Sequence, residues 1–231
     1  MGANLNSDEV EQKYIDSMGL ELGPVYNRLQ AECTFLNATW RQFVELFATS
    51  ELRAKVLVWS AEYFFEVVRD TFLEATLLKL SRITDPVIIG KKKNVTLALL
   101  PPLVDSALRP QIDVAFQAVV AATAFARDWR NRHIAHQDFG LVFDGGVTPL
   151  AVVTRKKIDD AIAAINMLLN LIENYYGDAT MAFDRLIARG QADDLLQVLN
   201  EEYQKDKEFQ TKLESRTLTA ADFHRRFRER I

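Results

Sequence analysis

The sequence predicts an all-α protein. Only nine glycines and six prolines occur among 231 residues, and they cluster in a few places, so long segments remain free of helix breakers. Within those segments apolar residues recur at spacings of three, four and seven, which places them on one face of a helix. Hydrophobic residues make up 48% of the chain, enough to build a substantial core. We therefore expect a helical bundle.

The first two helices are predicted from caps and breakers. Ser7 is a suitable N-cap, and Gly19 together with Gly23-Pro24 should close the short helix that it begins. A second helix should run from Val25 to about Ala48. The residues that share its apolar face are Tyr26, Leu29, Leu36, Trp40, Phe43 and Phe47.

The third helix should be the longest uninterrupted one. Thr49-Ser50-Glu51 is an N-cap pattern, and the segment continues without Gly or Pro to Asp85-Pro86. Its apolar residues cover most of the helix circumference, which is typical of a helix buried on several sides. We expect it to be central, with Phe64 and Phe65 in the core.

Two helices are predicted in the next part of the chain. After a loop from Asp85 to Lys93, Asn94 should cap a short helix that Pro101-Pro102 ends. A long fourth helix should extend from Pro110 to His136, with proline near its start, where proline is tolerated.

The remaining residues become increasingly polar. Residues 137–153 contain three glycines and suggest a small hairpin, and Thr154 should cap a helix that Gly177 ends. Beyond it we expect three short helices, near residues 181–188, 193–213 and 219–230. The predicted organisation is an N-terminal helix (1–24), a helical domain (25–177) and a charged helical C-terminal appendage (178–231).

Composition limits the classes of function. The net charge is −4, so any contact with nucleic acid has to be local. Cys33 is the only cysteine, which excludes an intrachain disulfide and a cysteine-based metal cage within one chain. The start of the chain does not resemble a secretory signal, and we find no candidate membrane span, so we expect a cytoplasmic protein without membrane contact.

Two basic segments are weak signals. Gly90-Lys91-Lys92-Lys93 lacks the upstream glycine and the following Ser or Thr of a phosphate loop, so we interpret it as a solvated loop. The charged stretch at residues 225–230 can steer RNA by charge, but such tails are usually solvated helix faces.

The main candidate site lies in the segment Arg130-Asn131-Arg132-His133-Ile134-Ala135-His136, which holds two of the three histidines. On an ideal helix Asp128, Arg132 and His136 share a face, and Arg130 is displaced from His136 by about a third of a turn. Either arginine can therefore share a cleft with His136.

These residue types suit metal-free RNA cleavage. Imidazole gives and takes protons near neutral pH, whereas guanidinium stays charged and grips phosphate with two N–H groups. A base can remove the proton of the ribose 2′-hydroxyl while a cation stabilises the charge that develops on phosphorus. The alternative is structural, because basic side chains at the end of a helix also stabilise its dipole and its terminal carbonyls.

At this motif the chain resembles the HEPN superfamily (higher eukaryotes and prokaryotes nucleotide-binding), and in particular its bacterial abortive-infection branch. In that superfamily an arginine, commonly followed by a polar residue, is separated from a histidine by four to six intervening residues. Arg130, followed by Asn131, is separated from His136 by five. The resemblance covers roughly residues 25–177. It also rests on the segments Trp40-Arg41, Phe64-Phe65, Leu80-Ser81-Arg82-Ile83-Thr84-Asp85-Pro86, Asn94-Val95-Thr96-Leu97 and Gln137-Asp138.

The resemblance implies a helical bundle that forms a homodimer, with two copies of the motif facing a shared cleft. It implies an endoribonuclease that needs no metal or cofactor. By position, Arg130 would hold phosphate, Asn131 would orient the site and His136 would be the acid-base residue. The flanking residues with less certain roles are Arg132, His133 and Asp138: His133 alternatively faces the core or the partner chain, and Asp138 would fix the imidazole tautomer or simply end the helix.

Two functions follow from the resemblance. The first is a toxin-like defence protein that cuts RNA, with an antitoxin or a nucleotidyltransferase as a possible partner. The second is a catalytically inactive HEPN module that uses the same groove to bind nucleotide, RNA or a partner protein. A third possibility is a purely structural role in dimerisation.

Overall fold

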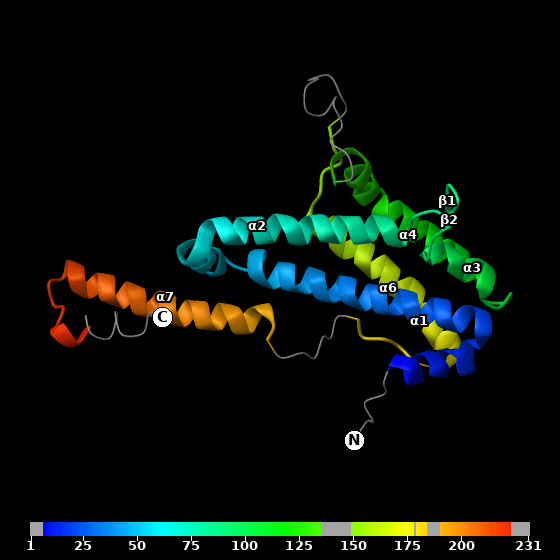
Figure 1. The fold of residues 1–231 in the computed structure, drawn as a ribbon, viewed down its shortest axis with the longest axis horizontal. Coiled ribbons are helices and arrows are strands. Elements are labelled where there is room, and N and C mark those ends of the chain that lie inside the picture. Colours follow the sequence, from blue (N-terminus) through cyan, green and yellow to red (C-terminus); the bar gives the residue numbers. More distant parts are fainter. Residues whose placement is uncertain (1–6, 135–148, 178, 184–189, 223–231) are drawn as a thin grey trace. The chain divides into compact units, whose positions relative to one another are not determined.

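The computed structural model describes residues 7–134, 149–177, 179–183 and 190–222 (Figure 1). The regular secondary structure of this part of the chain is helical apart from one minimal hairpin, which confirms the predicted all-α class. In chain order the elements are α1 (Ser7–Phe47), α2 (Glu51–Ile83), β1 (Ile88–Ile89), β2 (Lys92–Lys93), η1 (Leu97–Leu99), α3 (Leu100–Leu103), α4 (Arg109–Trp129), η2 (Arg130–Ile134), α6 (Arg155–Gly177) and α7 (Ala192–Glu214).

The chain forms two compact units, and the boundaries between them cut through α1 and α2. The first unit comprises residues 1–41 and 72–186, and the second comprises residues 42–71 and 187–231. The predicted functional segment and most of the elements belong to the first unit. No helix in the described ranges combines the length and the apolar character needed to cross a membrane.

Helix α1 bends sharply near its start. Gly19 has φ 84° and ψ 170°, a conformation that favours glycine, so the break predicted there is confirmed. Gly23 and Pro24, which were predicted to end the helix, instead lie inside the segment that follows. A Cβ on Gly23 would lie 2.7 Å from the carbonyl of Tyr14, so glycine is required where the two arms of α1 meet.

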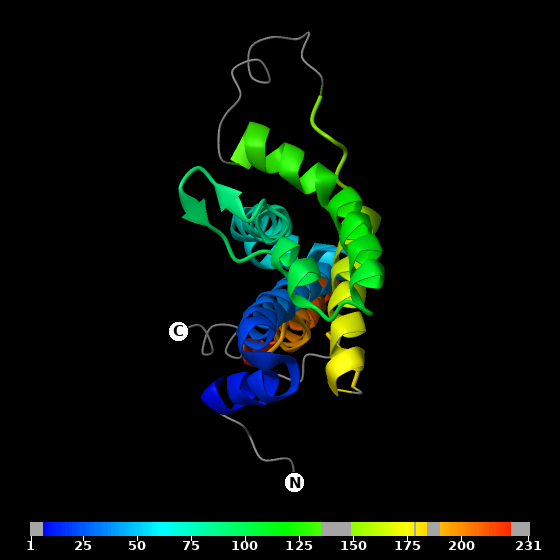
Figure 2. The ribbon, with the colours of Figure 1, turned by 90° about the vertical axis from the view of Figure 1, so that its right-hand side faces the viewer.

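The core of the first unit lies between α1 and α6. The Tyr26 hydroxyl donates to the Leu169 carbonyl at 3.2 Å, and the Trp40 indole donates to Asp159 Oδ1 at 2.6 Å, so the two helices run antiparallel. Helix α4 packs against α6, as Figure 2 shows in green and yellow. The predicted apolar stripe of α6 is buried at Ile158, Ile162, Ile165, Leu169 and Ile172.

Helix α2 begins as predicted, because Ser50 Oγ accepts the Arg53 amide at 3.3 Å. The expectation that the whole helix is central is wrong. Phe65 is 8% exposed but Phe64 is 60% exposed, and the helix is interrupted at Ala61. Residues 42–71 share a small unit with α7, and most side chains of this part of α2 are exposed.

The segment between α2 and α4 differs from the prediction. β1 and β2 form a tight antiparallel hairpin around Gly90, which has φ 60°. Asn94 does not cap a helix; its side chain donates to the Pro86 carbonyl at 3.0 Å and closes the hairpin. Pro101 and Pro102 lie in the first turn of α3 rather than at its end, because the first turn does not need their amide hydrogens.

The C-terminal helices partly follow the prediction. Thr154 Oγ1 accepts the Lys157 amide at 3.2 Å at the start of α6, and α6 ends at Gly177. Helix α7 corresponds to the helix predicted at residues 193–213. Residues 149–153 are not in a strand, and the rest of the predicted hairpin lies outside the described residues.

Candidate functional site

The Arg130–His136 segment begins where α4 changes its winding. The prediction extended one α-helix to His136, but α4 ends at Trp129 and a π-helical turn, η2, continues through Ile134. A π-turn alters which side chains align along a helix, and such turns are frequent at functional sites. The predicted site residues His136 and Asp138 lie outside the described residues, so the geometry below concerns Arg130 through His133.

Arg130 is fixed from the end of α2. Its Nη1 lies 2.6 Å from Asp85 Oδ2, and its Nε donates to Asn131 Oδ1 at 3.0 Å. The side chain of Asp85 is 8% exposed and that of Arg130 is 26% exposed. Because this ion pair is shielded from water on the Asp85 side, it restricts the guanidinium more firmly than a surface pair would. The structure thus brings Arg130 and Asn131 together.

The end of α2 is joined to α4 by a second set of contacts, one turn before Arg130. The Arg127 guanidinium donates to the backbone carbonyl of Thr84, and also to Thr84 Oγ1 at 3.2 Å. Thr123 Oγ1 lies 3.3 Å from the same hydroxyl. These contacts satisfy a carbonyl at the helix terminus. They set the position of α4 relative to Asp85.

The last turn of α4, just before the π-turn, contacts the chain that leads into α6. Asp128 pairs with Arg132 at 3.3 Å, as their predicted shared face requires, and its Oδ2 accepts the Ala151 amide at 2.9 Å. The Trp129 indole donates to the Ala151 carbonyl at 2.6 Å. Both backbone groups of Ala151 are therefore bound to α4, which ties the returning chain to the candidate site.

His133 is exposed and does not face the core, so that alternative for this residue is wrong. Its ring stands edge-on to Trp129, with the ring centroids 5.3 Å apart and the planes at 81°. Asn131 is also exposed, whereas Arg132 is partly buried beside Asp128. A histidine held against an aromatic ring but open to solvent is accessible to a substrate.

Sequence reasoning missed Asp85 as part of the site. Asp85 lies 45 residues before Arg130, so no local spacing connects the two. One signal was present, because Asp85 belongs to the Leu80–Pro86 segment that carried the resemblance to HEPN proteins. Its role in that segment becomes clear only when α2 and α4 are placed side by side.

Comparison with known proteins identifies the family of the chain. The family model HEPN_AbiU2, described as AbiU2, matches residues 20–198, which is well over half of the chain. No curated protein and no solved structure matches the chain. The matched range includes α2, α4, η2 and α6, and with them every described residue of the candidate site. The chain therefore belongs to the AbiU2 family of HEPN proteins.

Proposed function

We propose that this protein is a metal-independent endoribonuclease of the abortive-infection type. The observation that carries the proposal is the Arg130–Asp85 pair at the start of the π-turn, in a chain of the AbiU2 family of HEPN proteins. A cation held in one orientation is suited to stabilise charge that develops on a phosphate, because it needs no reorganisation during the reaction.

Arg130 keeps N–H groups that are available to bind a phosphate. A guanidinium carries five N–H groups, and the contacts with Asp85 and Asn131 use Nη1 and Nε. In the proposed reaction the remaining N–H groups of Arg130 hold the scissile phosphate, and Asn131 keeps the guanidinium oriented. Arg132 and His133 contact neighbouring parts of the RNA.

His136 is the proposed acid-base residue. It takes the proton of the ribose 2′-hydroxyl, and the oxygen attacks the adjacent phosphorus. The bond to the 5′-oxygen of the next nucleotide breaks, so the products are a 2′,3′-cyclic phosphate and a 5′-hydroxyl. Asp138 is proposed to fix the imidazole tautomer.

The functional unit is proposed to be a homodimer in which two motifs share one cleft. A cleavage reaction needs one group to accept a proton and another to donate one, and two copies of His136 supply both. The proposed setting is the cytoplasm, with RNA as substrate and with an antitoxin or a nucleotidyltransferase as a further partner.

One observation favours a second function, a catalytically inactive module that binds RNA or nucleotide. Asp85 neutralises part of the charge of Arg130, which weakens its stabilisation of a transition state more than its ability to bind a phosphate by hydrogen bonds. Under this reading Arg130→Ala weakens binding, and no turnover occurs in any preparation.

An RNA-cleavage assay in EDTA tests the proposal. Wild-type protein should cleave single-stranded RNA, leave cyclic phosphate ends and lose activity in His136→Ala. The matched control is His224→Ala, which removes the histidine outside the motif. Loss of cleavage in EDTA, or full activity of His136→Ala, would overturn the mechanism.

A further inference from the structure

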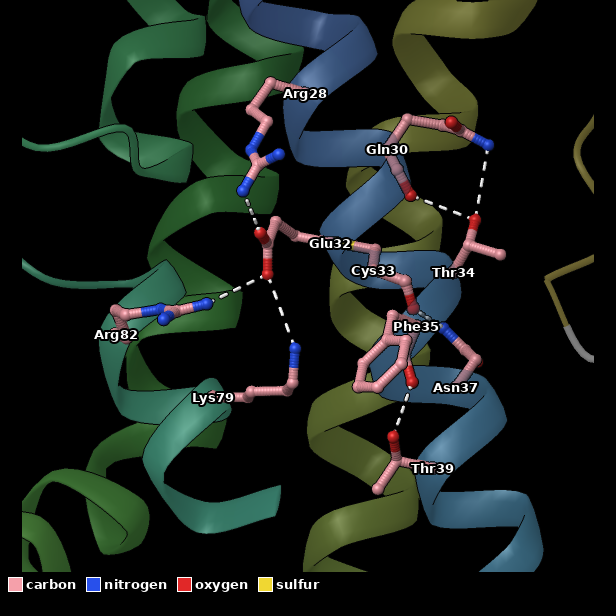
Figure 3. Close-up of polar contacts among 10 residues, drawn as sticks. All are labelled: Arg28, Gln30, Glu32, Cys33, Thr34, Phe35, Asn37, Thr39, Lys79 and Arg82. Carbon is pink, nitrogen blue, oxygen red and sulfur yellow. Dashed lines mark hydrogen bonds and ion pairs between the residues drawn. The ribbon is translucent and has the colours of Figure 1, made fainter. Parts of the chain in front are cut away.

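A second cluster of charged side chains lines a cavity of about 230 Å³ between α1 and the end of α2 (Figure 3). We call it the basic pocket; its charged residues are Arg28, Glu32, Lys79 and Arg82. The apolar residues that complete its walls are Leu29, Leu36, Ile83 and Val95. All of them belong to the first compact unit. The proposed cleavage reaction assigns no role to this pocket.

Three cations converge on one carboxylate in the basic pocket. Glu32 lies 2.6 Å from Arg28, 2.9 Å from Arg82 and 3.4 Å from Lys79, as the dashed lines in Figure 3 show. The side chains of Glu32 and Lys79 are 23% and 21% exposed, whereas those of Arg28 and Arg82 are 67% and 60% exposed. Glu32 and Lys79 are thus partly buried, and the two arginines that contact Glu32 are mostly exposed.

The basic pocket has a net positive charge. Burial is the largest influence on the pKa of Glu32 and raises it, but Lys79, Arg82 and Arg28 together outweigh burial and lower the pKa. Glu32 is therefore ionised at neutral pH and neutralises one of three cations. Two positive charges remain, in a protein whose net charge is −4. Such a local excess suits an anionic ligand.

The exposed arginines have the chemistry of a phosphate site. Each contacts Glu32 through Nη2, which leaves other N–H groups of the same planar fork directed away from that carboxylate. Two guanidinium groups close to one cavity can hold phosphate oxygens by charge-assisted hydrogen bonds.

The basic pocket and the candidate cleavage site both draw residues from the end of α2 and the turn after it. The Arg82 carbonyl accepts the Asp85 amide at 3.2 Å, and Asp85 holds Arg130. The next contact along the chain is the Asn94 amide, which donates to the Val87 carbonyl at 2.7 Å. This contact closes the β1–β2 hairpin, which follows α2 in the chain and whose lysines 91–93 are exposed.

We propose that the basic pocket binds a backbone phosphate of the RNA strand beside the site of cleavage, with Arg28 and Arg82 as the contacting residues. The inference rests on the proposed function, since RNA is the ligand that would engage Arg130 and the basic pocket together. Lysines 91–93 precede Val95, which lines the basic pocket, and add exposed positive charge to this part of the chain. The substrate class is therefore single-stranded RNA longer than one nucleotide.

Binding of a 2′-O-methyl RNA oligonucleotide in EDTA tests the proposal, because this RNA cannot be cleaved by 2′-hydroxyl attack. The test variant is Arg28→Gln/Arg82→Gln, and the control is Arg69→Gln/Lys205→Gln, which removes the same charge from the other compact unit. We expect the test variant to bind about tenfold or more weakly, with a salt dependence of log K that is shallower by about 0.7 per lost phosphate contact. Unchanged affinity and slope would overturn the proposal.

A single-site variant and a competition experiment with phosphate complete the test. Arg82→Gln alone keeps the Glu32 contacts with Arg28 and Lys79, so it provides a folded variant if the double variant unfolds. Displacement of the oligonucleotide by inorganic phosphate at micromolar concentration would assign the basic pocket to a small phosphorylated ligand and overturn the RNA assignment. If the test variant loses affinity but wild-type protein never cleaves RNA, the proposed ribonuclease function fails while the phosphate site stands.

Discussion

Arg130 and Asp85 form an ion pair that joins the candidate motif to the turn after α2. Their closest atoms are 2.6 Å apart; Asp85 lies in the turn just after α2, and Arg130 opens the π-turn after α4. Asp85 Oδ1 is buried and, within the described residues, has no hydrogen-bond partner, so the carboxylate depends on Arg130 for compensation of its charge. Each residue therefore determines how the other is placed.

We expect Asp85→Asn to reduce RNA cleavage by about 10- to 100-fold, because a guanidinium that is displaced by about an ångström loses its alignment with phosphorus. The side chain keeps its shape but loses the charge that orients Arg130. The measurement is the cleavage rate under single-turnover conditions.

The control for this prediction is Asp70→Asn, which breaks an exposed pair with Arg69 at 3.0 Å in the other compact unit. It should cleave RNA at the wild-type rate. A wild-type rate for Asp85→Asn would show that Arg130 does not need Asp85. Rescue of the rate by Asp85→Glu would identify charge, rather than packing, as the cause of the loss.

Local chemistry explains what the sequence predicted correctly. Ser50 and Thr154 begin helices because their hydroxyls accept amide hydrogens three residues later, and Gly19 breaks α1 because glycine adopts positive φ without strain. These effects act within a few residues. The positions of most helices, and the placement of the Arg130 motif near the end of a helix, could therefore be predicted from the sequence.

The predictions from the sequence that were wrong or incomplete depend on interactions between segments far apart in the chain. Asn94 is as suitable for capping a helix as for closing a hairpin, and its contact with Pro86 decides between them. Periodicity identified an apolar α2 but could not show how many neighbours surround each part of it, so Phe64 was placed in the core. The Asp85–Arg130 pair was missed for the same reason.

Phe64 and Phe65 should respond differently to truncation. Phe65 is 8% exposed, so Phe65→Ala should lower the free energy of unfolding by about 3 kcal/mol through lost packing and a residual cavity. Phe64 is 60% exposed and its ring meets Phe65 edge-on at 5.2 Å, so Phe64→Ala should cost about 1 kcal/mol or less. Urea unfolding followed by circular dichroism measures both. Equal losses would show that Phe64 is buried in solution.

Cys33 should be protected from thiol reagents in the folded protein. Its side chain is fully buried, and burial, reinforced by the neighbouring Glu32 carboxylate, raises the pKa of the thiol. Since the thiolate is the reactive form, we expect labelling by Ellman's reagent at pH 8 to be at least about 100-fold slower in the native protein than in 6 M guanidinium chloride. A control with Cys33→Ser and Ser17→Cys carries its single thiol at an exposed position of α1 and should react rapidly. Fast native labelling of wild-type protein would contradict the burial.

Glu32→Gln should change how stability depends on pH. The folded state lowers the pKa of Glu32 below its ordinary value of 4.5, so its ionised form contributes stability above that pH. The contribution is lost as pH falls through the lower, folded-state pKa.

We therefore expect wild-type protein to exceed Glu32→Gln in free energy of unfolding by about 1 kcal/mol at pH 7, with a smaller difference at high salt. The difference should shrink steadily below pH 4.5. Denaturant titrations at a series of pH values measure it, and Glu21→Gln, at an exposed position of α1, is the control. A difference that stays constant from pH 7 to pH 3 would mean that Glu32 acts through packing rather than through its charge. In that case the ion pairs of Glu32 with Lys79 and Arg82 would not stabilise the contact between α1 and α2.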